Sequence, residues 1–364
     1  MIEPSNQTNL HQDVGNFDLR GIVQIIWEFI VASVSSDPYV FGGVICDEPF
    51  IVLGKRMPVT GSNLGLMSIR PELFEKRRSL SLLTLAYTHE LPYQLKRLIG
   101  EIAEAAIRFP LATIVMLANT EIEHQSFKKA GIHSLLANEL IFGNISNYHL
   151  PQTRSQKVFD AVYVGRLHPQ KRHELARNIN SLLCLYYRTD LSTVNKFRES
   201  LPNAVFGNHD FNNNEFTLLT GDRYLAALDS SHVGLCLSEA EGAMRASIEY
   251  QLCGLPVVTT PSLGGRDRFL QHGFAMTVEP DAQEIAKAVT ALKDADFPAQ
   301  AVRDNAVALI QRDRTRFLEE IQSVITGVFG NDSPMLNRFE FFENACGQST
   351  RPLSKALAPT YRRS

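Results

Sequence analysis

The stretch that most constrains the fold of this chain is residues 232–265, which read as strand, loop, helix, strand and loop. Residues 233–237 are a short apolar run, and residues 257–260 are β-branched throughout, as expected of buried strands. Between them, residues 243–252 carry Met, Ile and Leu four positions apart, which is the spacing of one helix face. Gly254 stands where such a helix would end. The stretch therefore predicts two buried strands joined by a helix.

Two carboxylates bracket that helix. Glu241 lies in the loop before it, and Glu249 lies about two turns inside it. A loop that ends a strand and opens a helix offers unpaired backbone N–H groups and a positive dipole end, which favour a phosphate. A carboxylate further along then reaches a hydroxyl of the attached group. The alternative interpretation is that both glutamates are ordinary surface charges.

A second motif follows the apolar run at residues 161–164, where Gly165 and Arg166 lead through a short loop to Lys171. Arginine makes bidentate contacts to phosphate oxygens, and lysine adds a compact charge. When a bond to a nucleotide diphosphate breaks, two fixed cations stabilise the negative charge that develops on the leaving phosphate. A basic surface loop without a ligand is the alternative. We expect a helix from about His173 onward.

Together these motifs resemble those of retaining glycosyltransferases of the GT-B fold, the glycosyltransferase family 4-like or group 1 enzymes. The resemblance rests on Glu241-Gly242, Glu249, residues 253–258 (Cys-Gly-Leu-Pro-Val-Val) and the Gly-Arg-loop-Lys segment. The chain departs from the family pattern at residues 243–245, where an aromatic residue and a glycine are usual. The match covers residues 160–290 and is thin over residues 1–150.

The resemblance implies an α/β protein with two Rossmann-like doubly wound domains facing a cleft. It implies retaining transfer of a sugar from a nucleotide diphosphate sugar to a glycan, lipid-carrier, protein or small-molecule acceptor, as in polysaccharide biosynthesis. The nucleotide sugar is a substrate, and the implied chemistry needs no cofactor and no metal.

The resemblance also assigns roles to individual residues. Arg166 and Lys171 would bind the diphosphate, Glu241 would hold sugar hydroxyls, and Glu249 would take the ribose hydroxyls. His89 follows the apolar run at residues 82–87 and would lie on the acceptor side. The catalytic set is Arg166, Lys171, Glu241 and His89, and the donor-binding set is Gly165, Gly242, Ala243, Met244 and Glu249.

The predicted domains are residues 1–150 on the acceptor side, residues 151–330 for the nucleotide sugar, and a tail at residues 331–364. Strands and helices alternate from residue 160 to 290, which predicts a parallel, doubly wound second domain. In GT-B proteins a C-terminal helix crosses back to the first domain, and we expect residues 334–345 to do so.

The N-terminal half offers weaker signals. A glycine pair, Gly42-Gly43, and the segment 61–65 are interpreted as turns, with a loop facing the donor phosphates as the alternative. Residues 70–78 mix arginine and lysine with glutamate, which indicates a solvated helix face. The alternative for residues 70–78 is a docking patch for an anionic acceptor or a membrane surface. Residues 93–107 are expected to be helical.

The overall composition is that of a globular protein, with 44% hydrophobic residues and a formal net charge of −3, which argues against a nucleic-acid binder. The five cysteines are scattered without a Cys-x-x-Cys pair, which favours buried thiols in a reducing compartment. Residues 21–34 are apolar but too short to span a bilayer, so a buried helix is expected, with an interfacial membrane helix as the alternative. We expect a cytoplasmic protein, with peripheral contact to the inner face of a membrane as a further possibility.

Two competing functions stay open. One is another enzyme of the same architecture, such as a sugar-nucleotide epimerase or a phosphorylase. The other is a non-catalytic GT-B-like subunit that binds a nucleotide sugar or a partner glycosyltransferase, which the thin match over residues 1–150 favours. A dinucleotide oxidoreductase is unsupported, because no Gly-x-Gly-x-x-Gly follows any predicted strand.

Overall fold

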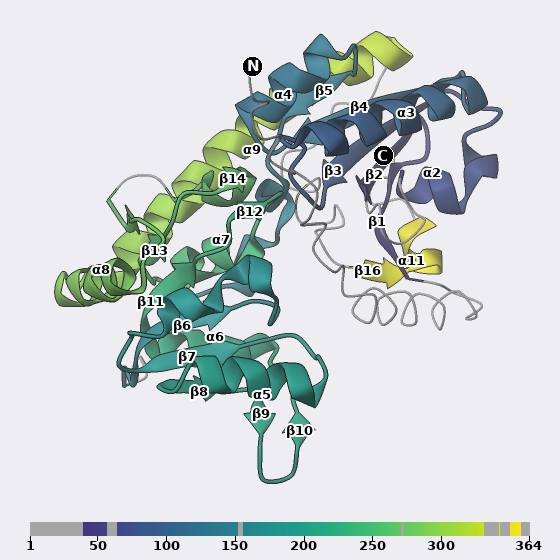
Figure 1. Ribbon diagram of the computed structural model, residues 1–364. Helices are drawn as coiled ribbons and strands as arrows, with labels where there is room; N and C mark the ends of the chain where they lie inside the picture. The colour runs from purple at the N-terminus through teal and green to yellow at the C-terminus, as the bar shows by residue number, and fades with distance from the viewer. Residues whose placement is uncertain are drawn as a thin grey trace, which may run out of the picture.

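The computed structural model of the chain describes residues 39–56, 64–151, 156–270, 273–330, 342 and 350–357. Two sheets dominate these residues, and helices cover each of them (Figure 1). One sheet is built mainly from the first half of the described chain and the other from the second half. The expected α/β class is confirmed.

The first sheet has the strand order β16-β1-β2-β3-β4-β5. Strands β2 to β5 are parallel, whereas β1 is antiparallel to both of its neighbours. The strands are β1 (Tyr39–Cys46), β2 (Phe50–Arg56), β3 (Ser79–Leu85), β4 (Ala112–Ala118), β5 (Ser134–Leu136) and β16 (Thr350–Pro352).

Both faces of this sheet are buried, as in most parallel sheets. Along β3, Leu80 and Leu82 enter the core beneath α9 (Ala299–Phe329), whereas Leu83 and Leu85 enter the core on the opposite face. The helices on that opposite face are α2 (Leu66–Ile69), α3 (Pro92–Arg108) and α4 (Glu121–Lys129), with α11 (Leu353–Leu357) beside β1. Because successive side chains of a strand point to opposite faces of the sheet, β3 contributes leucines to the cores on both faces.

The second sheet is parallel and has the order β15-β13-β11-β6-β7-β8. Its strands are β6 (Phe159–Val164), β7 (Leu182–Leu185), β8 (Ala204–Phe206), β11 (Ser231–Cys236), β13 (Val257–Thr259) and β15 (Ala275–Thr277). Its helices are α5 (Leu191–Ser200), α6 (Gly221–Asp229), α7 (Arg245–Leu252) and α8 (Ala282–Asp294). A hairpin of β9 (His209–Asp210) and β10 (Glu215–Phe216) projects beyond β8 (Figure 1).

Helix α9 connects the two halves of the molecule (Figure 1). Near its start it contacts α7, and further along Arg314 donates from Nε to the carbonyl of Ile141 at 2.8 Å. The expected crossing is therefore made by α9, earlier in the chain than residues 334–345. Of that range the structure describes Phe342, whose ring lies 5.9 Å from the ring of Phe142 in the core of the first sheet.

Three local expectations are wrong. Gly42 and Gly43 lie inside β1, because the absent side chains let the backbone of β2 and of α11 come close. Residues 70–78 form only a short 3-10 helix at Pro71–Leu73, and the half-exposed Arg77 stacks on Phe50, with its guanidinium carbon 3.3 Å from the ring centre. The segment after Arg172 is a 3-10 helix at His173–Ala176 instead of an α-helix, and Arg172, in a left-handed conformation, separates it from the 3-10 helix Pro169–Lys171.

The structure tests some of the remaining expectations, whereas others concern residues that it does not describe. The cysteines at 46, 184, 236 and 253 are buried free thiols, as expected. Among the described residues, no helix combines the length and apolar character needed to cross a bilayer. The predicted helix within residues 21–34, the start of the segment 61–65 and most of the tail lie outside the described residues.

Candidate functional site

The strand order of the second sheet defines a site. From β6 the chain moves outward through β7 and β8, and it then returns to the other side of β6 to build β11, β13 and β15. In open parallel sheets, ligands bind beyond the carboxyl ends of the strands where the order reverses. That switch point lies between β6 and β11, so the loops at residues 165–172 and 237–244 define the candidate site.

The loop after β6 carries the predicted cations. Arg166 is exposed, and within the described part of the chain its side chain forms no hydrogen bond or ion pair. Lys171 ends the 3-10 helix Pro169–Lys171, and its carbonyl accepts a hydrogen bond from the hydroxyl of Tyr163. Gly165 lies beside this lysine, since a Cβ there would lie 3.8 Å from Lys171 Cδ and Cε. Arg166 and Lys171 therefore belong to one loop, on the β6 side of the switch point.

The loop after β11 meets these cations directly. Nζ of Lys171 forms an ion pair with Oε1 of Glu241, and both side chains are largely buried. Gln170 donates from Nε2 to the carbonyl of Ala240 at 2.8 Å, and this hydrogen bond is a second contact between the same two loops. The structure thus brings together two predicted site residues that are 70 positions apart.

The start of α7 follows this loop. Met244 is its extended N-cap residue, and no side chain among the described residues caps the first turn. The backbone dipole at this end is therefore available for a negatively charged group. Gly242 and Met244 are buried and Ala243 is half-buried, whereas Arg245, at the first helical position, is exposed. This arginine is a cation that we did not predict.

Glu249 is buried, and both of its carboxylate oxygens have partners. The hydroxyl of Tyr148 donates to Oε1 at 2.5 Å, and the hydroxyl of Tyr224 donates to Oε2 at 2.6 Å. Burial and the neighbouring carboxylate raise the pKa of Tyr148 and of Tyr224, so both phenols stay protonated donors. Neither tyrosine was predicted, because each reaches Glu249 from a distant part of the chain.

Glycines bring the two halves of the molecule into contact beside the site. A Cβ on Gly242 would lie 2.9 Å from the carbonyl oxygen of Leu85, and one on Gly265 would lie 2.5 Å from Cβ of Asn119. Nδ2 of Asn138 donates to the carbonyl of Gly265 at 2.8 Å. The loops of the second sheet therefore dock against the carboxyl ends of β3 and β4, where only glycine allows the approach.

His89 lies in the loop after β3, but its ring is turned into the core. It is 1% exposed, its Nε2 lies 2.8 Å from Nη1 of Arg56, and its ring is 6.0 Å from that of Phe127. Burial, together with the charge of Arg56, lowers the pKa of His89 to about 4. The structure therefore does not group His89 with the switch-point residues, and its acceptor role stays a prediction.

The buried carboxylate of Glu123 holds the backbone of the loop that carries His89. Glu123 accepts hydrogen bonds from the backbone N–H groups of His89 at 2.6 Å and Asn119 at 2.8 Å. Burial raises the pKa of Glu123 to about 7 in spite of these two donors. The side chain thus ties together the loops that follow β3 and β4.

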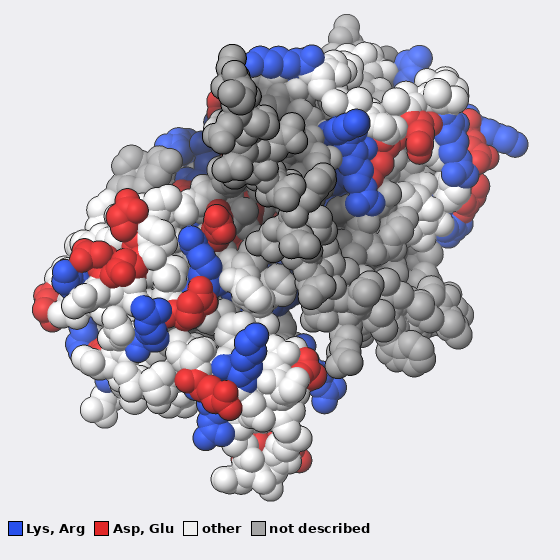
Figure 2. All heavy atoms as spheres, viewed as in Figure 1, with Lys and Arg blue, Asp and Glu red and all other residues white. Residues whose placement is uncertain are grey.

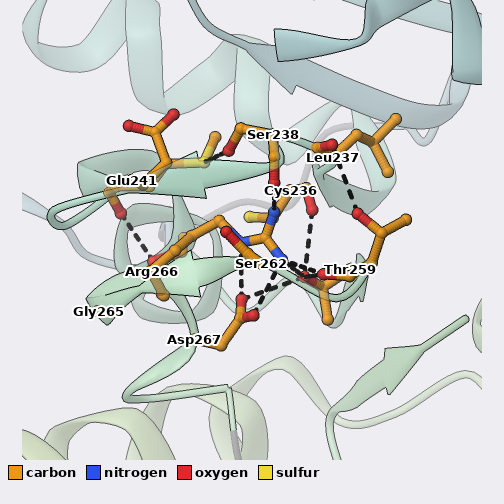
Figure 3. Close-up of polar contacts among 12 residues, drawn as sticks. Cys236, Leu237, Ser238, Glu241, Thr259, Ser262, Gly265, Arg266 and Asp267 are labelled. Carbon is orange, nitrogen blue, oxygen red and sulfur yellow. Dashed lines mark hydrogen bonds and ion pairs between the residues drawn. The ribbon is translucent and has the colours of Figure 1, made fainter. Parts of the chain in front are cut away.

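Two arginines, one buried and one half-buried, link the loops of the site. Arg266 is fully buried, and its guanidinium contacts the carbonyls of Ser238 and Thr260 and both carboxylate oxygens of Asp267 (Figure 3). Arg172 donates from Nε to the carbonyl of Leu237 at 2.6 Å. In the sequence this cluster is visible only as the Gly-Gly-Arg-Asp run at residues 264–267, and that run does not indicate that Arg266 is buried.

Charges of both signs surround this region. On the face shown in Figure 2, lysines and arginines lie among aspartates and glutamates over the second sheet and its helices. Within the described ranges, no group of three His, Cys, Asp or Glu side chains is arranged to hold a metal ion. The two loops of the switch point carry Arg166, Lys171, Arg172, Glu239 and Glu241, and Arg245 begins the helix that follows.

Comparison with known proteins agrees with this architecture. No protein-family model and no curated protein sequence matches the chain. The fold is similar to that of sucrose-phosphate synthase from Thermosynechococcus elongatus, with 13% identity, 76% of this chain and 74% of that chain covered, and a TM-score of 0.53.

Two further structures are similar. A glycosyltransferase from Rickettsia africae ESF-5 has 12% identity and a TM-score of 0.50, with 89% of this chain and 85% of that chain covered. TarM has 15% identity and a TM-score of 0.50, with 77% of this chain and 55% of that chain covered. The chain therefore has the fold of the GT-B glycosyltransferases, as the motifs had implied.

Proposed function

We propose that this protein is a glycosyltransferase that moves a sugar from a nucleotide diphosphate sugar to an acceptor. The observation that carries the proposal is the convergence of Arg166, Lys171, Glu241 and the uncapped start of α7 at the switch point of the second sheet. One protein of similar fold is itself described as a glycosyltransferase, which supports the same class of reaction.

Arg166 and Lys171 would bind the diphosphate and stabilise it as the leaving group. Cations in a fixed position contribute most where negative charge develops during bond cleavage. Lys171 is paired with Glu241, so a diphosphate would compete with that carboxylate for the ammonium. Once released, the carboxylate of Glu241 would be free to accept hydrogen bonds from sugar hydroxyls. Binding and sugar recognition would thus be coupled through one ion pair.

The remaining predicted residues divide into two groups. Four residues would contact the diphosphate through their backbone, either by donating N–H groups or by letting the backbone come close to it: Gly165, Gly242, Ala243 and Met244. Glu249 would contact the ribose hydroxyls, and because Tyr148 and Tyr224 already donate to it, the ribose would have to share or displace those bonds. His89 would influence the acceptor side through the loop that carries it, since its own ring is buried.

The proposal includes three finer features that follow from the motif resemblance. Transfer would retain the anomeric configuration, it would need no metal ion, and the acceptor would be a glycan, lipid carrier, protein or small molecule, as in polysaccharide biosynthesis. We place the reaction in the cytoplasm, with peripheral contact to the inner face of a membrane where the acceptor is lipid-linked.

A second candidate function is a non-catalytic subunit that binds a nucleotide sugar or a partner glycosyltransferase. The observation that favours it is the occupation of the key groups by the protein itself. Lys171 is paired with Glu241, and both oxygens of Glu249 are bonded to tyrosines. In such a protein the polar groups would serve stability rather than turnover.

The test begins with purified full-length protein and a panel of UDP, GDP, ADP and their common sugar conjugates. A ligand that binds the folded state raises the melting temperature by mass action. We expect a shift with one nucleotide family and release of its nucleoside diphosphate from the sugar conjugate. Arg166→Ala and Lys171→Ala should each lower the affinity for the nucleotide and the rate of nucleoside diphosphate release about tenfold or more, since each loses a charged contact to phosphate.

The control variant is Lys287→Ala, which removes an exposed lysine that is paired with Glu284 on α8, outside the site. Full activity of both Arg166→Ala and Lys171→Ala would contradict the proposed mechanism. Binding without turnover, together with turnover in the presence of a partner protein, would establish the second candidate instead.

A further inference from the structure

Three loops of the candidate site share one buried guanidinium. The side chain of Arg266 is 0% exposed, and it contacts the carbonyl of Ser238 after β11 and the carbonyl of Thr260 after β13. It also donates to Oγ1 of Thr259 at 2.7 Å and to the two oxygens of Asp267 at 2.8 and 2.9 Å (Figure 3). Asp267 therefore balances its charge, and its remaining donors go to two main-chain carbonyls and one hydroxyl.

A second arginine completes the cluster from the other side of the switch point. Arg172 directly follows Lys171, and it donates to the carbonyl of Leu237 at 2.6 Å and to Oγ1 of Thr260 at 2.8 Å. Consecutive carbonyls at Leu237 and Ser238 are thus held by two different arginines. We call Arg172 and Arg266 the arginine pair.

The segments that the arginine pair joins are the ones that carry the proposed chemistry. The loop at residues 165–172 carries Lys171, and the loop at residues 237–244 carries Glu241, whose carboxylate points away from Arg266 (Figure 3). The turn at Gly264–Gly265 docks against the carboxyl ends of β3 and β4. The backbone of Arg266 also accepts a hydrogen bond from Ser247 of α7 at 3.2 Å.

We propose that Arg266 is a positioning residue for sugar transfer, which fixes Glu241 and the start of α7 relative to Lys171 and to the first sheet. The proposal rests on the proposed function. A loop whose main-chain carbonyls are fixed by a buried, charge-balanced guanidinium loses freedom to shift. Catalysis depends on such fixing, because a displacement of about 1 Å at a reacting group lowers the rate by about a hundredfold.

The experiment compares Arg266→Lys with Arg314→Lys. Arg314 is a matched control because it is also a buried arginine that donates to main-chain carbonyls, those of Ile141 and Gly143, away from the switch point. Nucleoside diphosphate release from the sugar conjugate that the wild type turns over is measured as kcat and KM, at a temperature where both variants are folded.

We expect Arg266→Lys to lower kcat at least tenfold with KM changed less than threefold, and Arg314→Lys to lower the melting temperature with kcat within twofold of the wild type. Hydrogen exchange of peptides that cover residues 238–247 should be faster in Arg266→Lys and unchanged in Arg314→Lys. If Arg266→Lys does not fold, Asp267→Asn replaces it. That variant weakens the support of Arg266 and should lower kcat about threefold or more.

The outcomes are distinguishable. An Arg266→Lys protein with kcat and exchange rates like those of the wild type would overturn the positioning role and leave the proposed function intact. Equal losses of kcat in Arg266→Lys and Arg314→Lys would also overturn it, because the effect would then be general destabilisation. A wild-type protein that turns over no nucleotide sugar would overturn the proposed function and the positioning role together.

Discussion

The ammonium of Lys171 and the carboxylate of Glu241 form an ion pair that joins the two loops of the switch point. Their side chains are 16% and 15% exposed, so each charge is shielded from water but still reachable. The partial burial strengthens the pairing relative to a surface pair. A diphosphate that binds Lys171, as proposed, would therefore compete with Glu241 for the ammonium.

This competition gives the first prediction. Lys171→Met should weaken the binding of nucleoside diphosphate about tenfold or more, because a charge-assisted contact to phosphate is lost. Glu241→Gln should strengthen the same binding about threefold, because Lys171 is released from its partner, while it lowers sugar transfer. Isothermal titration of UDP, GDP and ADP measures the affinities. A Glu241→Gln protein that binds diphosphate as weakly as Lys171→Met would contradict the competition.

The contact between the two halves gives the second prediction. Gly242→Ala places a Cβ within 3.0 Å of backbone atoms of Leu85 and Ala86, and Gly265→Ala places one within 2.6 Å of Asn119, Asn138 and Gly242. Such overpacking costs about 1–3 kcal/mol of unfolding free energy or pushes the two halves apart. Urea unfolding and the radius of gyration from small-angle scattering separate these effects.

The control for the glycine variants is Gly327→Ala. Gly327 lies in α9, and a Cβ there meets nothing within 4 Å. Because alanine is the better helix former, this variant should gain about 0.5–1 kcal/mol. Unchanged stability and dimensions in Gly242→Ala and Gly265→Ala would show that the halves do not rely on the close approach.

The sequence predicted the switch-point residues because their positions follow from local patterns. A predicted strand precedes each of the loops that carry Arg166 and Glu241, so the position of both residues beyond strand ends could be predicted from the sequence alone. The side chains that contact Glu249 from distant parts of the chain could not be predicted in this way. Tyr148 and Tyr224 meet Glu249 from positions 101 and 25 residues away.

Other misses have equally specific causes. Arginine is almost never fully buried unless it is paired, so residues 264–267 gave no hint that Arg266 lies in the core. Residues 70–78 were interpreted as a solvated helix face because basic and acidic side chains are mixed there, yet Arg77 pairs with Asp47 and stacks on Phe50. Helix α9 was expected, but its contacts with Ile141 and Gly143 depend on tertiary structure.

The tyrosines on Glu249 give the third prediction. Tyr148→Phe and Tyr224→Phe should each lower the free energy of unfolding by about 1.5–3 kcal/mol, because each removes a hydrogen bond to a buried carboxylate. Double-mutant cycles with Glu249→Gln, measured by urea unfolding, isolate each pair. Tyr93→Phe, on the exposed side of α3, should change stability little. Coupling energies near zero would show that the tyrosines do not support Glu249.

Buried His173 gives the fourth prediction, which concerns pH. The ring is stacked on Tyr163 at 4.3 Å, and burial, with the charge of Lys171, lowers its pKa from 6.5 to about 3. The folded state keeps this histidine neutral while the unfolded state takes up a proton below pH 6.5. The stability that it contributes is therefore fully present above pH 6.5 and is lost as the pH falls towards 3. Between pH 6.5 and 4.5, His173→Phe should therefore lose about 2 kcal/mol less free energy of unfolding than the wild type, as measured by urea unfolding at both pH values.

Glu123 gives a fifth prediction of the opposite sign. Burial raises its pKa from 4.5 to about 7, so the folded state holds a proton that the unfolded state releases above pH 4.5. The stability from this group is present below pH 4.5 and is lost as the pH rises through 7. The glutamine of Glu123→Gln cannot titrate. Between pH 4.5 and 7 this variant should therefore lose about 3 kcal/mol less free energy of unfolding than the wild type. Urea unfolding at both pH values measures the difference, and a pH dependence parallel to the wild type would show that Glu123 is ionised in the folded protein. Such a result would leave the hydrogen bonds to His89 and Asn119 in place but remove burial as the dominant influence on its charge.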